Sequence, residues 1–468
     1  MSSFQRSGSG AQDPGVAHVI SMKLSSAAKS LNATYLGEDV EFIGCSTDSR
    51  NLNSGELFIA IKGERFDGHD FLESAKQRGA VAAMVTKTGQ QDLPTLVVED
   101  TRKAMGNLAA TWRSGFDVPL IAVTGSNGKT TVKEMLVSIL SLKTPVLATR
   151  GNLNNDIGVP LTLFGLGNEH HYAVVEMGAN HLGEISWLSH IVRPTVALIT
   201  QCAPAHLEGF GSVEGVARAK AEIFDGLEPE GIAIINADDD FAGLWRNKVT
   251  GFKQISFGLK NRSDITAKSI TPSMIKGTNN FQLCTPVGTI DIELPLLGQH
   301  NIMNAMAATA CALALEIELT LVKQGLERMK PVKGRLEMKK GLHGSRIIDD
   351  TYNANPVSLN AAIKTIASLT GKRWLVLGDM GELGTLSESL HEEAGNIARE
   401  NGIKKIFAIG PLSENAVRSF GQGAQHFSSV EKMIEAIKKE ISDDVTLLVK
   451  GSRSMQMERV VSALEANN

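Results

Sequence analysis

The fold is decided by residues 120–136, which read LIAVTGSNGKTTVKEML. Residues 120–123 are apolar, as in a buried strand, and apolar residues recur from Val132 to Leu140 at i, i+3, i+4, i+7 and i+8, as on one face of a helix. The turn between them holds Gly125 and Gly128. Glycines there let backbone N–H groups close round a phosphate, and the helix N-terminus adds its positive dipole end. The stretch therefore predicts a strand, a phosphate-binding loop and a helix.

The residues that open this helix supply the rest of a nucleotide site. Lys129 provides a point charge, and a threonine hydroxyl after it can reach a phosphate-bound Mg²⁺. The spacing departs from the usual G-x-x-x-x-G-K-[ST], since Val123 stands five positions before Gly128. A plain strand-to-helix turn is the alternative, but it leaves Lys-Thr-Thr without a packing role. We predict that the nucleotide is bound by Gly125, Ser126, Asn127, Gly128, Lys129, Thr130 and Thr131.

Length and composition bound the protein class. The 468 residues are too many for one core, with 42% hydrophobic and 21% charged residues and a net charge of -4. That charge gives no basic surface for nucleic acid, and no apolar run is long enough for a membrane span. The four cysteines are scattered without C-x-x-C spacing, which favours a reducing cytoplasm over a zinc or disulfide framework. We also predict a monomer.

Apolar strands and helical periods alternate along most of the chain. This alternation predicts an α/β protein of three domains. We assign residues 22–99 to a small mixed N-terminal domain, 100–330 to a central ATPase-type domain with a parallel sheet, and 331–468 to a Rossmann-like domain. Residues 1–21 are rich in Ser and Gly and are interpreted as a disordered extension or a cloning remnant.

Three further residues of the central domain are candidates for a metal site. Glu176 ends an apolar strand that should lie beside the phosphate-loop strand, and His206 follows another strand end. Lys220 falls within the apolar stripe of a helix that Ser212 should cap, where a charge is unfavourable unless it is paired, neutralised or modified. The alternatives are a solvated Glu176, a structural His206 and a Lys220 whose ammonium reaches past the edge of the stripe.

The chain resembles the Mur ligase family over nearly all of residues 22–468, and within it the ligases that take D-alanyl-D-alanine. The segments that carry the resemblance read, in chain order, TDSR, GELFIAIKGERFDGHDF, GNLNNDIGVP, VEMGANHLGEI, AHLEGFGSVEGVARAKAEIF, LLGQHNIMNA, GRLE, DDTYNANP, GDMGELG and LVKGSRS. The resemblance implies an ATP-dependent amide ligase that joins D-alanyl-D-alanine to UDP-N-acetylmuramoyl-tripeptide. It implies an acyl-phosphate intermediate, with the pentapeptide cell-wall precursor, ADP and phosphate as products.

The resemblance also assigns roles to residues. It implies a carbamate, derived from CO₂, on Lys220, and a Mg²⁺ site, with Mn²⁺ as the substitute, formed by Thr130, Glu176, His206 and Lys220. Lys129, Glu176, His206 and Lys220 would then be the catalytic residues. Asn301 resembles the adenine contact of the family, and Arg335 and Asp350 its nucleotide-closing residues. From the residues alone, Asn301 could equally cap a helix and Arg335 be a surface charge.

Further positions match substrate-binding segments of the family. An Arg beside small hydroxyl donors suits a pyrophosphate, and asparagine amides can bind a peptide or sugar in both directions, although solvated turns are the ordinary interpretation of both patterns. The implied substrate residues are Asp48, Ser49, Arg50, Asn152, Asn154, Asn155, Tyr352, Asn353, Lys450 and Arg453.

Other functions remain alternatives. A ligase that adds the third peptide residue has the same fold, but those that take diaminopimelate carry Asn-Pro-Arg where this chain has Asn-Ala-Asn-Pro. Folylpolyglutamate synthase lacks a TDSR domain. A nucleotide-binding switch would leave Lys220, Arg335 and Asp350 without a role.

Overall fold

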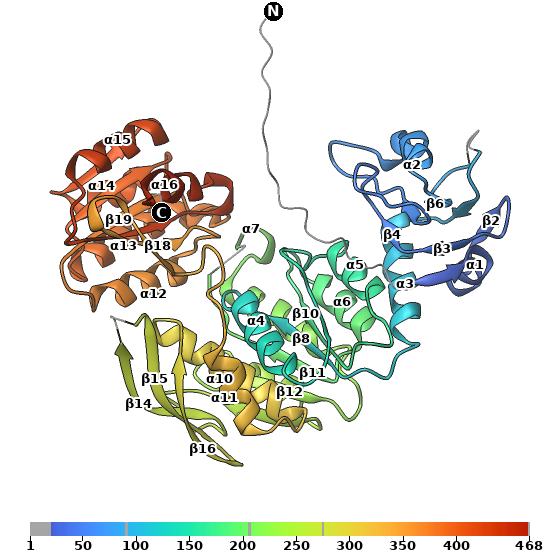
Figure 1. Ribbon diagram of the computed structural model, residues 1–468, viewed down its shortest axis with the longest axis horizontal. Helices are drawn as coiled ribbons and strands as arrows, with labels where there is room; N and C mark the ends of the chain where they lie inside the picture. The colour runs from blue at the N-terminus through green and yellow to red at the C-terminus, as the bar shows by residue number, and fades with distance from the viewer. Residues whose placement is uncertain (1–19, 89–91, 205–206, 274–275, 467–468) are drawn as a thin grey trace, which may run out of the picture. The chain divides into compact units, whose positions relative to one another are not determined.

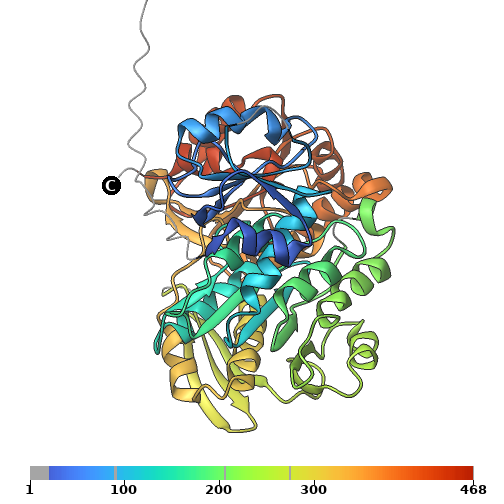
Figure 2. The same ribbon diagram turned by 90° about the vertical axis from the view of Figure 1, so that its right-hand side faces the viewer.

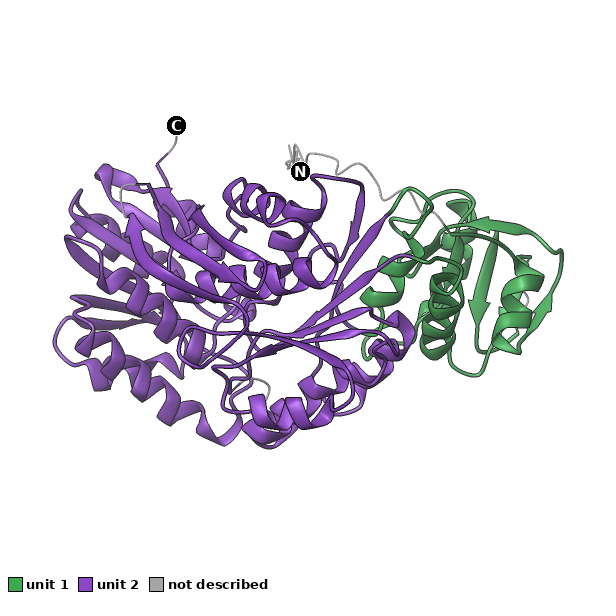
Figure 3. Cartoon of the chain, turned by 90° about the horizontal axis from the view of Figure 1, so that it is seen from below, with its two compact units in different colours: residues 1–117, 156–170 green, residues 118–155, 171–468 purple. Residues whose placement is uncertain are grey.

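The computed structural model describes residues 20–88, 92–204, 207–273 and 276–466. They fall into two compact units, one of residues up to 117 together with 156–170, the other of 118–155 and 171–468 (Figure 3). Of the predicted extension, Ile20, which is buried, and Ser21, which begins a strand, are described. The domain boundaries stay predictions. Within the described ranges no helix is long and apolar enough to cross a membrane.

The first unit is built round a five-stranded sheet in the order β2-β7-β6-β5-β4, with a separate antiparallel pair β1-β3. The pairs β4-β5, β5-β6 and β6-β7 are parallel, and β2 runs antiparallel to β7. The strands are β1 Ser21–Lys23, β2 Thr34–Leu36, β3 Glu41–Ile43, β4 Cys45–Ser46, β5 Leu57–Ile59, β6 Ala82–Val85 and β7 Thr95–Val97. The helices are α1 Leu24–Leu31, α2 Leu72–Gln77, α3 Thr101–Arg113 and α5 Gly158–Phe164.

The second unit begins with a six-stranded parallel sheet in the order β13-β12-β11-β8-β10-β9. The strands are β8 Leu120–Thr124, β9 Val146–Ala148, β10 Tyr172–Glu176, β11 Val196–Ile199, β12 Ile232–Asn236 and β13 Lys253–Phe257. The helices of this part are α4 Lys129–Leu140, α6 Glu184–Val192, α7 Leu207–Phe210, α8 Val213–Ala221, α9 Ala242–Lys248, α10 Gln299–Ala314 and α11 Leu319–Glu327. All five residues of β8 are buried, as expected for a strand flanked on both sides. The predicted strand, loop and helix of residues 120–140 are confirmed.

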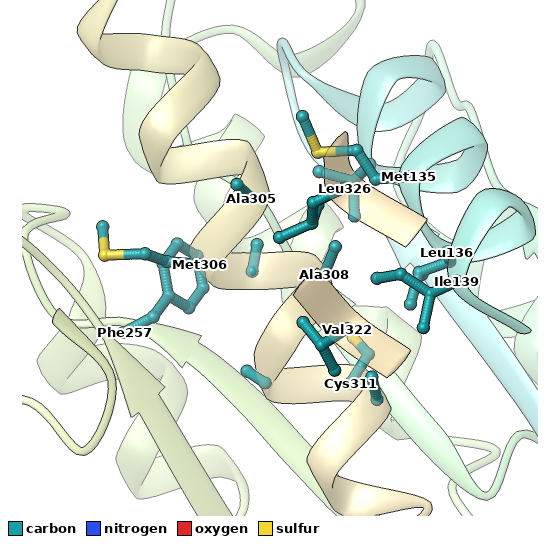
Figure 4. Close-up of a cluster of buried hydrophobic side chains, with 14 of the residues drawn as sticks. Met135, Leu136, Ile139, Phe257, Ala305, Met306, Ala308, Cys311, Val322 and Leu326 are labelled. Atoms are coloured by element: carbon teal, nitrogen blue, oxygen red, sulfur yellow. The ribbon is translucent and has the colours of Figure 1, made fainter. Parts of the chain in front are cut away.

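The apolar face of α4 forms the core of this domain. Met135, Leu136 and Ile139 contribute to one buried cluster with Val322 and Leu326 of α11 and with small residues of α10 (Figure 4). The alanines of α10 allow that helix to approach α4 closely, so the core fixes the helix that begins at the phosphate loop.

A three-stranded antiparallel sheet, not expected from the sequence, lies between β13 and α10 in the chain (Figure 2, yellow-green). Its strands are β14 Thr266–Ser273, β15 Thr278–Thr285 and β16 Gly288–Leu294. Phe281, Leu283, Ile292 and Leu294 are buried in the α4 core, whereas the intervening residues are less buried. This alternation of buried and exposed residues is the pattern of a sheet with one covered face.

The C-terminal part has a sheet in the order β17-β18-β22-β19-β20-β21, parallel except for β17. Its strands are β17 Glu337–Lys340, β18 Arg346–Asp350, β19 Lys372–Gly378, β20 Lys405–Ile409, β21 Ala424–Phe427 and β22 Val445–Lys450. Its helices are α12 Pro356–Ala367, α13 Ser387–Glu400, α14 Ser413–Phe420, α15 Val430–Glu440 and α16 Glu458–Leu464 (Figure 1). One core contains residues of α12, α13 and α14, and a second contains residues of α15 and α16. Two cores on one parallel sheet are the predicted Rossmann-like arrangement, and the three-domain α/β fold is confirmed.

Candidate active site

The phosphate loop joins β8 to α4 and requires glycine at two positions. Gly125 has φ +145°, and a Cβ there would lie 1.9 Å from Thr200 Oγ1. Gly128 has φ +85°, and a Cβ there would lie 2.5 Å from Asn304 Oδ1. Both backbone conformations favour glycine, and both positions are tightly packed against neighbouring side chains. The loop is therefore held in one shape by residues that come later in the chain.

Polar contacts reinforce that shape. Ser126 Oγ donates to Ala203 O at 3.0 Å, and Thr200 Oγ1 donates to Asn127 O at 2.6 Å. The Lys129 ammonium donates to Gly125 O at 2.6 Å and so folds back over the loop. Burial lowers the pKa of Lys129, while the carboxylate of Glu176 acts in the opposite direction. The loop thus carries a cation directly above the backbone that should cradle phosphates.

Glu176 lies beside the loop because β10 pairs with β8, with Glu176 opposite Val123. Its Oε2 accepts a hydrogen bond from Thr130 Oγ1 at 3.0 Å, and its Oε1 accepts one from Asn154 Nδ2 at 2.8 Å. The predicted neighbourhood of strand end and phosphate loop is confirmed. A carboxylate and a hydroxyl are oxygen donors of the kind Mg²⁺ prefers, so Thr130 and Glu176 fit that ion. In the described ranges no three His, Cys, Asp or Glu side chains gather into a metal-binding group, and His206 lies outside those ranges.

Lys220 is buried, with 2% of its surface exposed, in helix α8. Ser212 caps this helix as predicted, since its side chain accepts from Gly215 N. Among the residues the structure describes, Lys220 has neither an ion pair nor a hydrogen bond, and its Nζ lies 5.5 Å from the ring centre of Phe210. Burial, with a smaller contribution from Lys129, lowers the pKa of Lys220 to about 7. The alternative in which the ammonium reaches solvent is wrong.

A cavity of about 1110 Å³ adjoins the phosphate loop and is lined by residues of the second unit. The cavity is lined on one part by the phosphate loop, Glu176 and Lys220, and on another by residues of the C-terminal sheet and of the loops that connect its strands. Of the predicted site residues it includes Ser126, Asn127, Gly128, Lys129, Thr130, Thr131, Asn152, Asn154, Asn155, Glu176, Lys220, Asn301, Arg335, Asp350, Tyr352, Asn353, Lys450 and Arg453. One cavity therefore unites residues that are up to 327 positions apart, from Ser126 to Arg453.

Arg335 is the cation that the C-terminal part contributes beside the loop. Its Nη2 donates to Thr130 Oγ1 at 3.3 Å, and its guanidinium carbon lies 4.0 Å from the ring centre of Tyr352. Its Nε is buried and has no hydrogen-bond partner among the residues that the structure describes. A stacked guanidinium with an unsatisfied donor suits an anion such as a phosphate.

Asp350 and Lys450 stand opposite each other at the ends of β18 and β22. Lys450 Nζ lies 2.5 Å from Asp350 Oδ2 and donates to Asn353 O at 2.9 Å. Burial lowers the pKa of Lys450, and Asp350 opposes that effect. This ammonium therefore holds the loop that carries Tyr352 and Asn353.

The predicted substrate residues of the first unit form a local cluster. Arg50 Nε and Nη2 each donate to one oxygen of Asp48 at 2.9 Å, and Ser49 is buried. The hydrogen bond from Arg50 lowers the pKa of Asp48.

Comparisons with known proteins agree with this architecture. Residues 40–113 match the model of the Mur ligase family catalytic domain, 123–312 that of the Mur ligase middle domain, and 334–453 that of the Mur ligase glutamate ligase domain. The chain belongs to the Mur ligase family. It is 45% identical over 452 residues to the UDP-N-acetylmuramoyl-tripeptide–D-alanyl-D-alanine ligase of Escherichia coli K12, covering 96% of this chain and 99% of the relative.

Solved Mur ligases have the same fold. A crystal structure of MurF from Acinetobacter baumannii has a TM-score of 0.90 at 38% identity and covers 95% of this chain and 99% of its own. The MurF ligase from Thermotoga maritima in complex with ADP has a TM-score of 0.81 at 28% identity and covers 90% of this chain and 96% of its own.

The lining of the cavity of this Mur ligase also includes polar residues that the sequence patterns did not predict, among them Lys133, His300 and Asn304. Asn304 Nδ2 donates to Asn301 Oδ1 at 3.1 Å, and its own Oδ1 faces Gly128. The i, i+3 spacing of Asn301 and Asn304 in α10 puts both on one helix face, a signal that could have found Asn304. Burial lowers the pKa of His300 to about 4, so its imidazole is neutral near pH 7.

Proposed function

We propose that this chain is an ATP-dependent ligase that joins D-alanyl-D-alanine to UDP-N-acetylmuramoyl-tripeptide and forms the pentapeptide precursor, ADP and phosphate. The cavity carries this proposal, because in it the phosphate loop and Glu176 face Arg335 and Asp350 of the C-terminal part. The 45% identity with a relative that bears the name of this activity supports the same conclusion.

In the proposed reaction the C-terminal carboxylate of the tripeptide attacks the γ-phosphorus of ATP, and ADP leaves. The amine of D-alanyl-D-alanine then attacks the acyl phosphate, loses a proton and displaces inorganic phosphate. The difficulty of the first step is the approach of two anions. Lys129, which contacts the loop, and Arg335 supply positive charge at the cavity, and this charge would offset the repulsion between the two anions. A nucleophilic side chain is not required.

Thr130 and Glu176, together with His206 and a modified Lys220, would hold Mg²⁺ or Mn²⁺. When bound, such an ion neutralises phosphate charge and orients the transferred group. The contacts from Thr130 Oγ1 and Asn154 Nδ2 keep both oxygens of Glu176 in fixed directions before ligands arrive. Asn301, which lines the same cavity as the loop, would contact the adenine.

Lys220 is proposed to carry a carbamate. Its Nζ would attack CO₂ and lose a proton, which converts a buried cation into an anion with two oxygen donors. Burial supports this, because the side chain is almost completely buried and burial lowers the pKa of Lys220 to about 7, which leaves a large share of the amine neutral and nucleophilic at physiological pH. In the described part of the chain no carboxylate pairs with Lys220 in its unmodified form.

The remaining predicted residues are proposed to bind the substrates. Asp48, Ser49 and Arg50 would contact the uridine diphosphate, and Asn152, Asn154 and Asn155 the sugar or peptide. Tyr352, Asn353, Lys450 and Arg453 would border the acceptor site. We place the enzyme in the cytoplasm, where ATP and UDP-linked substrates are made, and propose that it acts as a monomer.

The test is phosphate release from ATP with UDP-N-acetylmuramoyl-tripeptide, with and without D-alanyl-D-alanine, followed by mass analysis of the product. We expect release that depends on the dipeptide and a product heavier by one dipeptide less water. Equal release without the dipeptide would rule out the ligase reaction. Efficient use of a single amino acid with UDP-N-acetylmuramoyl-dipeptide would indicate the third-residue ligase instead.

A further inference from the structure

Lys133 is a buried cation that the proposed reaction does not use. It lies one helical turn after Lys129 in α4 and lines the same cavity, yet only 2% of its surface is exposed. Its Nζ donates to Thr149 O at 2.7 Å and lies 2.7 Å from Glu134 Oε1. Burying an ammonium costs free energy, and an apolar side chain would fill the same space at a lower cost. The contacts of Lys133 therefore call for a functional explanation.

The contacts of Thr149 indicate what the buried Lys133 ammonium does. Thr149 directly follows β9, and its N–H donates to Val174 O at 3.1 Å. Its Oγ1 accepts the hydrogen bond of Glu176 N at 2.9 Å. The residue that accepts from Lys133 is therefore also the residue that holds the backbone of Glu176.

A second connection runs through the segment after Thr149. Asn154 donates Nδ2 to Glu176 Oε1 at 2.8 Å, and its carbonyl accepts from Gly178 N at 2.7 Å. The segment 149–154 thus contacts Glu176 at its backbone and at its carboxylate. A shift of this segment would turn the carboxylate away from Thr130.

We propose that Lys133 is a positioning residue: by fixing Thr149 it holds the segment 149–154, and through it directs the Glu176 carboxylate toward Thr130 and the metal site. The inference rests on the proposed metal role of Glu176. Residues that orient a metal ligand without touching the ion typically change metal affinity or activity by about 10- to 100-fold when replaced.

The test compares Lys133→Met with Thr149→Val, which removes the hydroxyl that accepts from Glu176 N and leaves the Lys133 charge in place. Thr149→Ser keeps the hydroxyl and is the matched control for Thr149→Val. Lys143→Met is the matched control for Lys133→Met, because Lys143 is exposed, follows α4 and does not line the cavity. Mn²⁺ binding to the full chain with ADP present is measured by electron paramagnetic resonance, and ADP binding without metal by calorimetry.

We expect the dissociation constant of Mn²⁺ to rise at least about 10-fold in Lys133→Met and in Thr149→Val, with metal-free ADP binding within about twofold of the unmodified chain. Thr149→Ser and Lys143→Met should bind Mn²⁺ like the unmodified chain. In the ligase assay, the Mg²⁺ concentration for half-maximal rate should rise in the first two variants, which a loss of folded protein alone would not cause.

Folded Lys133→Met that binds Mn²⁺ within twofold of the unmodified chain would overturn the inference. So would a defect in Lys133→Met that Thr149→Val lacks, since the charge itself would then be responsible. If Lys133→Met does not fold, Thr149→Val against Thr149→Ser decides the question. Failure of the proposed function gives a different result, because the unmodified chain would then form no product.

Discussion

Replacing Gly125 with alanine tests the idea that the phosphate loop is shaped by close packing. The ideal Cβ of an alanine at this position would lie 1.9 Å from Thr200 Oγ1, where real Cβ atoms essentially never come nearer than 3.0 Å. Thr200 would have to move by about 1.1 Å, the difference between these two distances. Its hydroxyl donates to Asn127 O at 2.6 Å and lies 3.2 Å from Thr124 O, so the movement breaks contacts that hold the loop.

Two contributions set the magnitude. A backbone with φ +145° costs an alanine about 1–3 kcal/mol, and the lost hydrogen bonds of Thr200 cost about 1 kcal/mol more. The loop of the variant can avoid the backbone strain and the lost hydrogen bonds by adopting another conformation. Binding of ATP must then restore the native conformation, so the cost weakens ATP binding. A total of about 2–4 kcal/mol corresponds to an ATP dissociation constant that rises roughly 30- to 800-fold.

The assay is calorimetric titration of the full chain with ATP, after circular dichroism has shown that the variant is folded. Gly243→Ala is the matched control, because Gly243 lies within α9 with open space round its Cβ position and no positive φ. That substitution should leave ATP affinity unchanged and stabilise the helix by up to about 1 kcal/mol. An ATP dissociation constant for folded Gly125→Ala within threefold of that of the unmodified chain would refute the reasoning.

Two further predictions concern titratable groups. Because the neutral amine of Lys220 is needed to bind CO₂ and its pKa is about 7, the rate should fall as the pH drops through about 7, and more bicarbonate should be needed there. Lys220→Gln removes a proposed metal ligand, so it should lose at least about 100-fold in rate and all response to bicarbonate. A Lys220→Gln enzyme with full activity would exclude the carbamate. His391 Nε2 accepts a hydrogen bond from Met380 N at 2.9 Å, and burial lowers the pKa of His391 below 6.5. As the pH falls, the unfolded chain therefore takes up a proton on His391 before the folded chain does. The folded state loses stability as the pH falls below about 6.5. The melting temperature of the unmodified chain should therefore fall more steeply between pH 7 and 5 than that of His391→Leu. At pH 7 the variant should be less stable than the unmodified chain by about 1–3 kcal/mol, because Met380 N loses its hydrogen-bond acceptor. Equal slopes of melting temperature against pH would contradict this.

Local patterns predicted much of the fold. The apolar run before Gly125 and the helical period after Lys129 give β8 and α4, since both depend on spacing within about ten residues. Ser212 likewise gives the start of α8. The three-stranded antiparallel sheet β14–β16 was not predicted, although its strands alternate, because a series of βαβ units has no place for an antiparallel sheet inserted between β13 and α10.

The candidate site also contains residues that local patterns predicted and residues that they did not. The motif residues of the phosphate loop were found because each has a chemical purpose that its type and position reveal. Lys133 was missed because its role depends on Thr149, which a sheet, not the local sequence, brings beside it. The roles of the predicted site residues stay predictions.

The sequence by itself determined the phosphate loop, the order of α/β elements and the resemblance to a ligase family, because these depend on residue types at short, fixed spacings. Only the tertiary structure decided that Lys220 is fully buried, that Thr130 and Asn154 share the two oxygens of Glu176, and that Arg335 reaches the phosphate loop. The physical reason is that burial and hydrogen bonds depend on the distances between side chains. Those distances are set by which strands pair and how the cores pack.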